Sequence, residues 1–121
     1  MVWYPREELI IYIHDEQVKE YGGRLGFHRD RSLLTLIINE TRRCEGDIFH
    51  KAAFLLRKTI LTHVFKDGQH RTGFVMVDMF LRENHRKMYH SDYLQARTFL
   101  KRIRTYSIQE IVEWLKYGRV P

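Results

Sequence analysis

The sequence predicts an all-α protein, a compact single domain of about six helices around a central buried helix. The chain has 121 residues, which is the usual size of one domain. Apolar residues recur at helical spacing along most of the chain, and no pair of alternating apolar and polar segments indicates a β-hairpin. We therefore expect residues 1–121 to form one domain.

The helices of the first half are predicted from their apolar spacing and from the signals at their ends. The first spans about residues 6–20 and stops at the glycine pair 22–23, because glycine readily adopts the left-handed conformations that end helices. A short helix follows the N-cap candidate Asp30. Asp47 then begins a long helix that reaches about Val64.

The helices of the second half follow from the same signals. A loop over residues 65–71 leads to the segment 73–83, which is apolar on all sides and is therefore typical of a helix at the centre of a domain. Periodicity alone also fits a buried strand there, but the length and the Met and Leu content favour a helix. Ser91 or Asp92 caps a fifth helix, and residues 107–110 form a capping box for the last one.

Composition and charge narrow the classes of function. The formal net charge of +6 attracts anions of any kind, which include nucleic acid, phosphate ligands and acidic proteins. No apolar run is long enough to span a membrane, and the N-terminus lacks the pattern of a secretory signal. Cys44 is the only cysteine, so no disulfide forms within the chain. We therefore expect a cytoplasmic protein without a membrane partner.

His63 is the first chemically notable residue of the loop at 63–72. It follows Ile60 and Leu56 by three and seven residues, which places it on the core-facing side of the long helix. A histidine there suits the role of general base toward an attacking hydroxyl. We expect His63 and Asp67 to converge on one cleft, whereas a purely structural histidine would lie buried against the two apolar side chains.

The rest of this loop offers a metal ligand and an anion site. Asp67 suits magnesium, which binds few carboxylates and several phosphate oxygens. Gly68 lets backbone amides approach a ligand closely. Arg71 and Thr72 stand at the start of the central helix, where free amides and the helix dipole favour bound phosphate. A plain chain-reversing turn followed by a helix start explains the same residues without any ligand.

Three segments of the chain resemble the Fic/Doc superfamily. The loop, read as His-x-Phe-x-Asp-Gly-x-x-Arg-Thr, closely resembles the signature of that superfamily. The Tyr-Gly-Gly-x-x-Gly run at 21–26 resembles a segment near the N-terminus of Doc (death-on-curing) proteins. The Phe-Leu-x-x-Asn run at 80–84 resembles the end of the family's central helix, and a last helix from Ser107 also falls where Doc proteins have one. The resemblance covers nearly the whole chain, whose length is similar to that of the short Doc branch.

The resemblance implies an ATP-dependent transferase that modifies a protein hydroxyl with the help of Mg²⁺. Doc toxins transfer the γ-phosphoryl group and Fic members typically transfer AMP, and phosphoryl transfer is the expected reaction here. The family pattern makes His63 and Asp67 catalytic, with Asp67 on the metal. It assigns nucleotide and phosphate binding to the residues that follow, Gly68, Gln69, His70, Arg71 and Thr72. It also implies a protein substrate, for example a translation factor, and a small antitoxin as partner.

Three positions depart from the family pattern. Gln69 stands where Asn is usual, and His70 stands where Fic members have Gly and Doc members Lys. Phe74 occupies the position of a second Arg in typical Fic motifs, which resembles Doc and argues against AMP transfer. An alternative interpretation is therefore a catalytically impaired module that binds a nucleotide or a partner, because a displaced amide at position 69 costs rate.

Two other features have plainer interpretations. His14-Asp15 resembles a metal-binding dipeptide, but a satisfied pair on a helix is the better prediction because no further ligands accompany it. A basic helical domain that binds nucleic acid is a third, less favoured hypothesis, and we expect the basic residues of the C-terminal half to form a solvated face. These residues are Arg82, Arg86, Lys87, Arg97, Lys101, Arg102 and Arg104.

Overall fold

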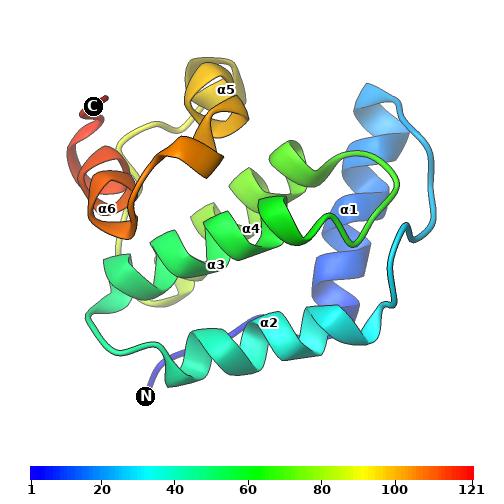
Figure 1. Cartoon of the computed structure of the whole chain (residues 1–121), viewed down its shortest axis with the longest axis horizontal. Coiled ribbons are helices and arrows are strands. Elements are labelled where there is room, and N and C mark those ends of the chain that lie inside the picture. The colour runs from blue at the N-terminus through cyan, green and yellow to red at the C-terminus, as the bar shows by residue number, and fades with distance from the viewer.

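A computed structural model of the chain describes residues 1–121 and contains only helices as regular structure (Figure 1). The predicted all-α class with six α-helices is thereby confirmed. A short 3₁₀ helix precedes the last of them. In chain order the elements are α1 Glu7–Tyr21, α2 Ser32–Arg43, α3 Ile48–Thr62, α4 Gln69–Glu83, α5 Tyr93–Lys101, η1 Ile103–Thr105 and α6 Ile108–Tyr117.

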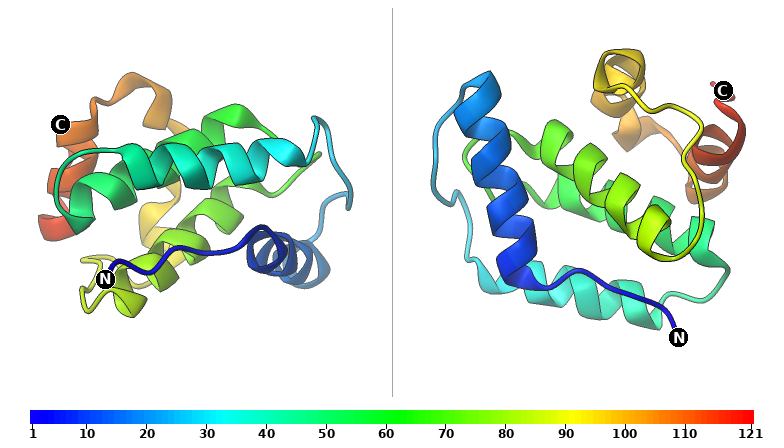
Figure 2. Two further views of the ribbon diagram at one scale, coloured as in Figure 1. Left: turned by 90° about the horizontal axis from the view of Figure 1, so that it is seen from below. Right: turned by 180° about the vertical axis from the view of Figure 1, so that it is seen from behind.

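The helices α3 and α4 form a hairpin at the centre of the molecule (Figure 1). α3 also packs on α2 and α6, and α4 packs on α1 and α5 (Figure 2). Gly73 allows the two central helices to approach closely, because a Cβ atom there would lie 3.2 Å from side-chain atoms of Leu56 and Ile60. The hairpin thus places the loop between α3 and α4 against the end of α1.

The central helix α4 is buried along most of its surface, as the apolar run predicts. Phe74, Met76, Val77, Phe80 and Leu81 lie in the core. One stripe of the helix reaches solvent, where Asp78 pairs with Arg82 at 3.2 Å. No helix of the structure is both long and apolar enough to cross a membrane.

The helix ends follow the predicted caps except at the start of α2 and on both sides of the loop. Arg31 rather than the predicted Asp30 is the N-cap of α2, and Asp30 accepts from the amide of Ser32, the first residue of the helix, at 2.8 Å. Asp47 accepts a hydrogen bond from the amide of His50, and residues 107–110 form the expected capping box. Asp92 rather than Ser91 caps α5. α3 ends at Thr62, before the predicted Val64, and α4 begins at Gln69 rather than at residue 73. The loop is therefore shorter than predicted.

Candidate functional site

Two left-handed residues define the loop between α3 and α4. His63 ends α3 with φ 56°, and Gly68 precedes α4 with φ 83°. Glycine tolerates such a value at little cost, whereas a histidine adopts it only where the surroundings hold it there. The chain reverses between these two points, so that residues 63–68 form one short turn and residues 69–72 begin α4.

A second loop, which connects α1 to α2, fixes the position of the first. Phe27 and Phe65 form an isolated antiparallel β-bridge, and their rings stack with centroids 5.5 Å apart. The amide of His28 donates to the carbonyl of Val64 at 2.8 Å, and the amide of Lys66 donates to Gly26 at 3.1 Å. Residues about 40 positions apart in the chain therefore form one structural unit.

One face of α1 packs against the loop between α3 and α4. His14, Val18 and Tyr21 share this face, because they are spaced by four and three residues. His14 contacts Asp67, Tyr21 contacts Arg71, and Val18 lies near Gly68. A Cβ atom added to Gly68 would lie 3.4 Å from Val18 and 3.5 Å from His14, which is ordinary contact, so the positive φ rather than lack of space favours glycine there.

His14 is the most deeply buried of these three side chains. Its Nε2 atom lies 2.7 Å from the carbonyl oxygen of Asp67, and its Nδ1 atom lies 3.0 Å from a carboxylate oxygen of Asp15. Its ring stacks on that of Phe65 with centroids 3.7 Å apart. The predicted satisfied pair with Asp15 is thus confirmed. The contact with Asp67 was not foreseen, since periodicity within α1 does not reveal which loop the helix will meet.

His63 is exposed to solvent, and its predicted orientation toward the core is wrong. The physical reason is the end of α3 at Thr62, because a left-handed residue no longer follows the helical order that places every third or fourth side chain on one face. The imidazole lies edge-on to His28, with ring centroids 5.3 Å apart. The amide nitrogen of Gln69 lies 3.4 Å from Nε2, which is long for a hydrogen bond.

Asp67 is held by Arg24 from the loop after α1. The backbone amide and Nε of Arg24 both donate to Oδ2 of Asp67, at 2.7 and 3.0 Å. The hydrogen bonds from Arg24, with a smaller contribution from the charge of His63, hold the pKa of this carboxyl below its usual range. Gly23 permits this approach, because a Cβ atom there would lie only 3.1 Å from Cβ of Asp67.

The donor set at Asp67 fits one kind of magnesium site and not another. No group of three or more potential ligands exists in the structure, so a metal bound by protein side chains alone does not fit. The remaining carboxylate oxygen, Oδ1, receives no hydrogen bond from the protein. One free carboxylate oxygen matches a magnesium ion that is bound mainly through the phosphates of a nucleotide.

Gln69 and Thr72 lie inside the molecule rather than around the predicted phosphate site. The amide of Gln69 donates to the carbonyl of Phe65 at 2.9 Å, and this side chain is 4% exposed. Its Oε1 atom and the hydroxyl of Thr72 have no hydrogen-bond partner. The extra methylene of glutamine lets the amide fold back over the loop. The phosphate-binding roles predicted for these two residues stay predictions.

His70 and Arg71 occupy the first turn of α4 and differ in charge. Burial, followed by the positive charges of Lys101 and His63, lowers the pKa of His70. The imidazole of His70 is therefore neutral near pH 7 and contributes less to anion binding than a lysine would. The guanidinium of Arg71 forms no hydrogen bond or ion pair with the protein, and its contacts are with aromatic rings.

The rings of two tyrosines enclose the guanidinium of Arg71. Its Cζ atom lies 3.8 Å from the ring centroid of Tyr21 and 4.2 Å from that of Tyr93. Such distances are typical of cation–π contacts. Tyr21 ends α1 and Tyr93 begins α5, so neither could be assigned to the site from residues 63–72 alone.

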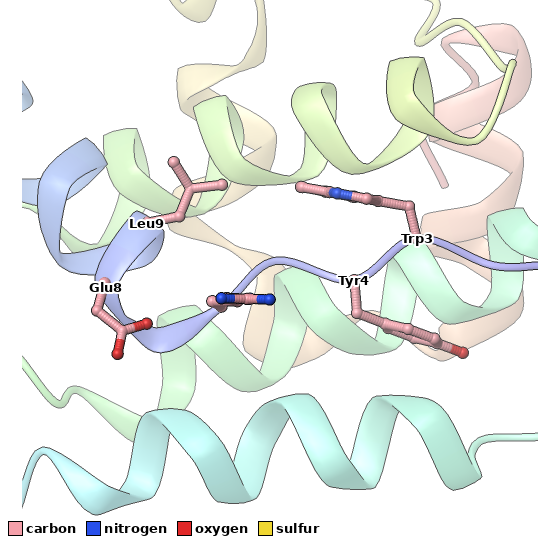
Figure 3. A pocket seen from close by; sticks show the side chains of 5 residues that line it. Trp3, Tyr4, Glu8 and Leu9 are labelled. Atoms are coloured by element: carbon pink, nitrogen blue, oxygen red, sulfur yellow. The ribbon is translucent and has the colours of Figure 1, made fainter.

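None of the four hollows of the molecule is lined by residues 63–72, so the cleft expected at His63 and Asp67 stays a prediction. A hollow of about 430 Å³ lies instead beside the N-terminal segment, with Trp3, Tyr4 and Leu9 among its lining residues (Figure 3). Asn84, just after α4, holds Trp3 there, because its Oδ1 atom accepts from the backbone amide of Trp3 at 2.8 Å. This hollow is thus at the other end of α4 from the loop.

Comparison with known proteins agrees with this arrangement. The family model described as Fic/DOC family matches residues 4–81, which is more than half of the chain. The chain therefore belongs to the Fic/DOC family. The match includes α1, the pairing loops and all of the motif loop, and it ends within α4. No curated protein is similar enough to count as a match. Membership of the family indicates a protein-modifying transferase or a related module.

Proposed function

We propose that the chain transfers the γ-phosphoryl group of ATP to a hydroxyl of a protein, at the loop of residues 63–72. One observation carries this proposal. His63, Oδ1 of Asp67 and the guanidinium of Arg71 belong to the same short loop and helix start, and each retains uncommitted capacity to bind or react. These three groups correspond to a base, a metal ligand and an anion site.

The proposed reaction divides the work among these residues. Arg71 holds phosphate oxygens through its N–H groups, next to the free amides of the first turn of α4. Asp67 would hold magnesium through Oδ1, and the metal would neutralise phosphate charge. His63 accepts the proton of the attacking hydroxyl as its oxygen bonds to the γ-phosphorus. The bond from that phosphorus to the bridging oxygen breaks, and ADP leaves with the electron pair.

Phe74 supports phosphoryl transfer over AMP transfer. The side chain is 6% exposed, and its ring packs edge-on against Tyr93 with centroids 5.7 Å apart. A residue in this position therefore faces the core and offers no charge to a nucleotide. Typical Fic motifs have a second arginine at this place, and its absence resembles the Doc branch.

A catalytically impaired binding module is the second candidate, and two contacts favour it. Arg24 neutralises Asp67, which lowers the attraction of this carboxylate for a metal ion. The amide of Gln69 is used by the carbonyl of Phe65 and so does not face a ligand. Both contacts would have to be compatible with nucleotide binding for the enzyme to turn over. The loop would otherwise bind an anion or a partner without chemistry.

Labelled ATP distinguishes the candidate reactions. The purified protein is incubated with Mg²⁺, a cell extract that contains translation factors, and ATP labelled at either the α- or the γ-phosphate. Phosphoryl transfer predicts protein-bound label from the γ-position only, and His63→Ala should abolish it. Label from the α-position would show AMP transfer instead. If the folded protein transfers no label from either position, the transferase proposal is wrong for these conditions and the binding module is favoured.

A double substitution separates impairment from activity. Gln69→Asn combined with His70→Lys restores the residues that are usual in Doc proteins. If the native loop is impaired, the double variant gains transfer that the native protein lacks. If the native loop is active, both proteins transfer label and the gain is small. We also propose a small antitoxin as partner, and expression with and without the neighbouring reading frame tests it. A cytoplasmic location is a further proposal.

A further inference from the structure

The guanidinium of Arg71 has an unusual environment for a charged side chain. Tyr21 covers one face of its plane and Tyr93 lies close to it as well, while no carboxylate and no carbonyl accepts from it. An arginine carries five N–H donors at the rim of its plane. The two rings therefore hold the side chain in place and leave all of these donors unused by the protein.

This kind of contact differs from an ion pair in its effect on ligand binding. A carboxylate partner would hold the arginine but would also neutralise it and occupy its donors, as Arg24 and Asp67 do for each other. Aromatic rings attract the cation through their faces and leave its edge free. Burial raises the pKa of Tyr93, so its ring faces Arg71 as the neutral phenol.

Holding the arginine before the ligand arrives favours binding. A free arginine side chain loses much rotational freedom when it is immobilised by a ligand, and that loss weakens binding. Here the rings from α1 and α5 already restrict the side chain. They also shield it partly from water, which strengthens its attraction to an anion.

We propose that Tyr21 and Tyr93 are positioning residues that hold Arg71 in the orientation in which it binds phosphate groups. This inference rests on the proposed function, because it assumes that Arg71 is the anion-binding group. It also gives a role to the tyrosine of the Tyr-Gly-Gly segment. Gly22 and Gly23 turn the chain after Tyr21, with φ 93° and 114°, and this turn leads the chain to Asp67.

Tyr21 is the better position for a test, because it is 54% exposed and its replacement should not disturb the core. Titration calorimetry is performed with inorganic pyrophosphate and, separately, with ATP and Mg²⁺. We expect Tyr21→Leu to weaken both by about five- to tenfold, the scale of a cation–π contact. Tyr21→Phe keeps the aromatic face and should bind within about twofold of the native protein.

A matched control and a structural readout make the outcomes unambiguous. Tyr12→Leu replaces another exposed tyrosine of α1, 62% exposed, and should leave binding unchanged. Circular dichroism should show the same helix content for all three variants. If the native protein binds and folded Tyr21→Leu binds equally well, the positioning role is wrong. If the native protein binds neither pyrophosphate nor ATP, the proposed function itself fails, and this inference with it.

Discussion

Replacing His14 tests how strongly α1 supports the motif loop. The side chain is fully buried, stacks on Phe65 and bonds the carbonyl of Asp67, although these residues lie about 50 positions further along the chain. We expect His14→Ala to destabilise the whole domain and not only the end of α1. The reason is that the loop connects the two central helices, on which every other helix packs.

The size of the effect follows from two contributions. Loss of the hydrogen bond leaves the carbonyl of Asp67 without its partner, at a cost of about 1–3 kcal/mol. Loss of the ring removes an aromatic pair, which contributes about 0.5–1.5 kcal/mol beyond its area. Together they predict a decrease of about 1.5–4.5 kcal/mol in the free energy of unfolding. His14→Phe keeps the ring and should lose only about 1–3 kcal/mol.

Urea denaturation measures these free energies directly, and thermal denaturation should show a fall in Tm of about 6–18 °C for His14→Ala. His28→Ala is the matched control, because His28 is exposed and donates to the loop through its backbone amide, which alanine retains. We expect the control to change stability by less than about 0.5 kcal/mol. A loss for His14→Ala that is no larger than the loss of this control would refute the reasoning.

The other predictions concern the loop and the first turn of α4. Arg71→Ala should weaken ATP binding by about 1.5–3 kcal/mol, the scale of a hydrogen bond to a charged group. If calorimetry shows native affinity for this variant, Arg71 is not the anion-binding residue. His63→Ala should leave ATP binding nearly unchanged and lower turnover, since a base acts in the transition state. If label-transfer kinetics show that the variant loses ATP affinity as much as turnover, the role of His63 as a base is contradicted. Gly68→Ala should lose about 1–2 kcal/mol in urea denaturation, because φ is 83° and a side chain is strained there. Because the pKa of His70 is lowered from its usual 6.5, the unfolded state binds the proton first, so stability should fall as the pH drops below about 6.5. His70→Gln should flatten this part of the stability profile, and an unchanged profile would show that another group is responsible.

The helical fold could be predicted because its signals are local. Asp47, Asp92 and the pair at 107 and 110 each satisfy amides within the next turn, so a few neighbouring residues suffice to identify a helix start. The start of α4 was missed because it carries no such local side-chain signal. Gly68 begins that helix through its backbone conformation, without a side-chain cap, and polar Gln69 and His70 resemble loop residues in sequence.

The motif loop itself was found from sequence, but its surroundings were not. The orientation of His63 depends on one left-handed backbone angle, which apolar spacing does not encode. The contacts of His14, Arg24 and Tyr21 with the loop join segments far apart in the chain. Their spacing shows which residues share a face of α1, yet nothing in one segment indicates the element that this face will meet. The contacts of these residues with the loop can be identified only from the packed structure.

Mapping of bound nucleotide by NMR tests most directly whether the motif loop is the ligand site. The alternative is the hollow of about 430 Å³ beside Trp3, because no hollow is lined by residues of the loop. ATP with Mg²⁺ is added stepwise to ¹⁵N-labelled protein. Our account predicts that the side-chain signal of Arg71 and the amide of Gly68 shift, while the amide and indole signals of Trp3 stay in place. Shifts at Trp3 without change at Arg71 and Gly68 would contradict it.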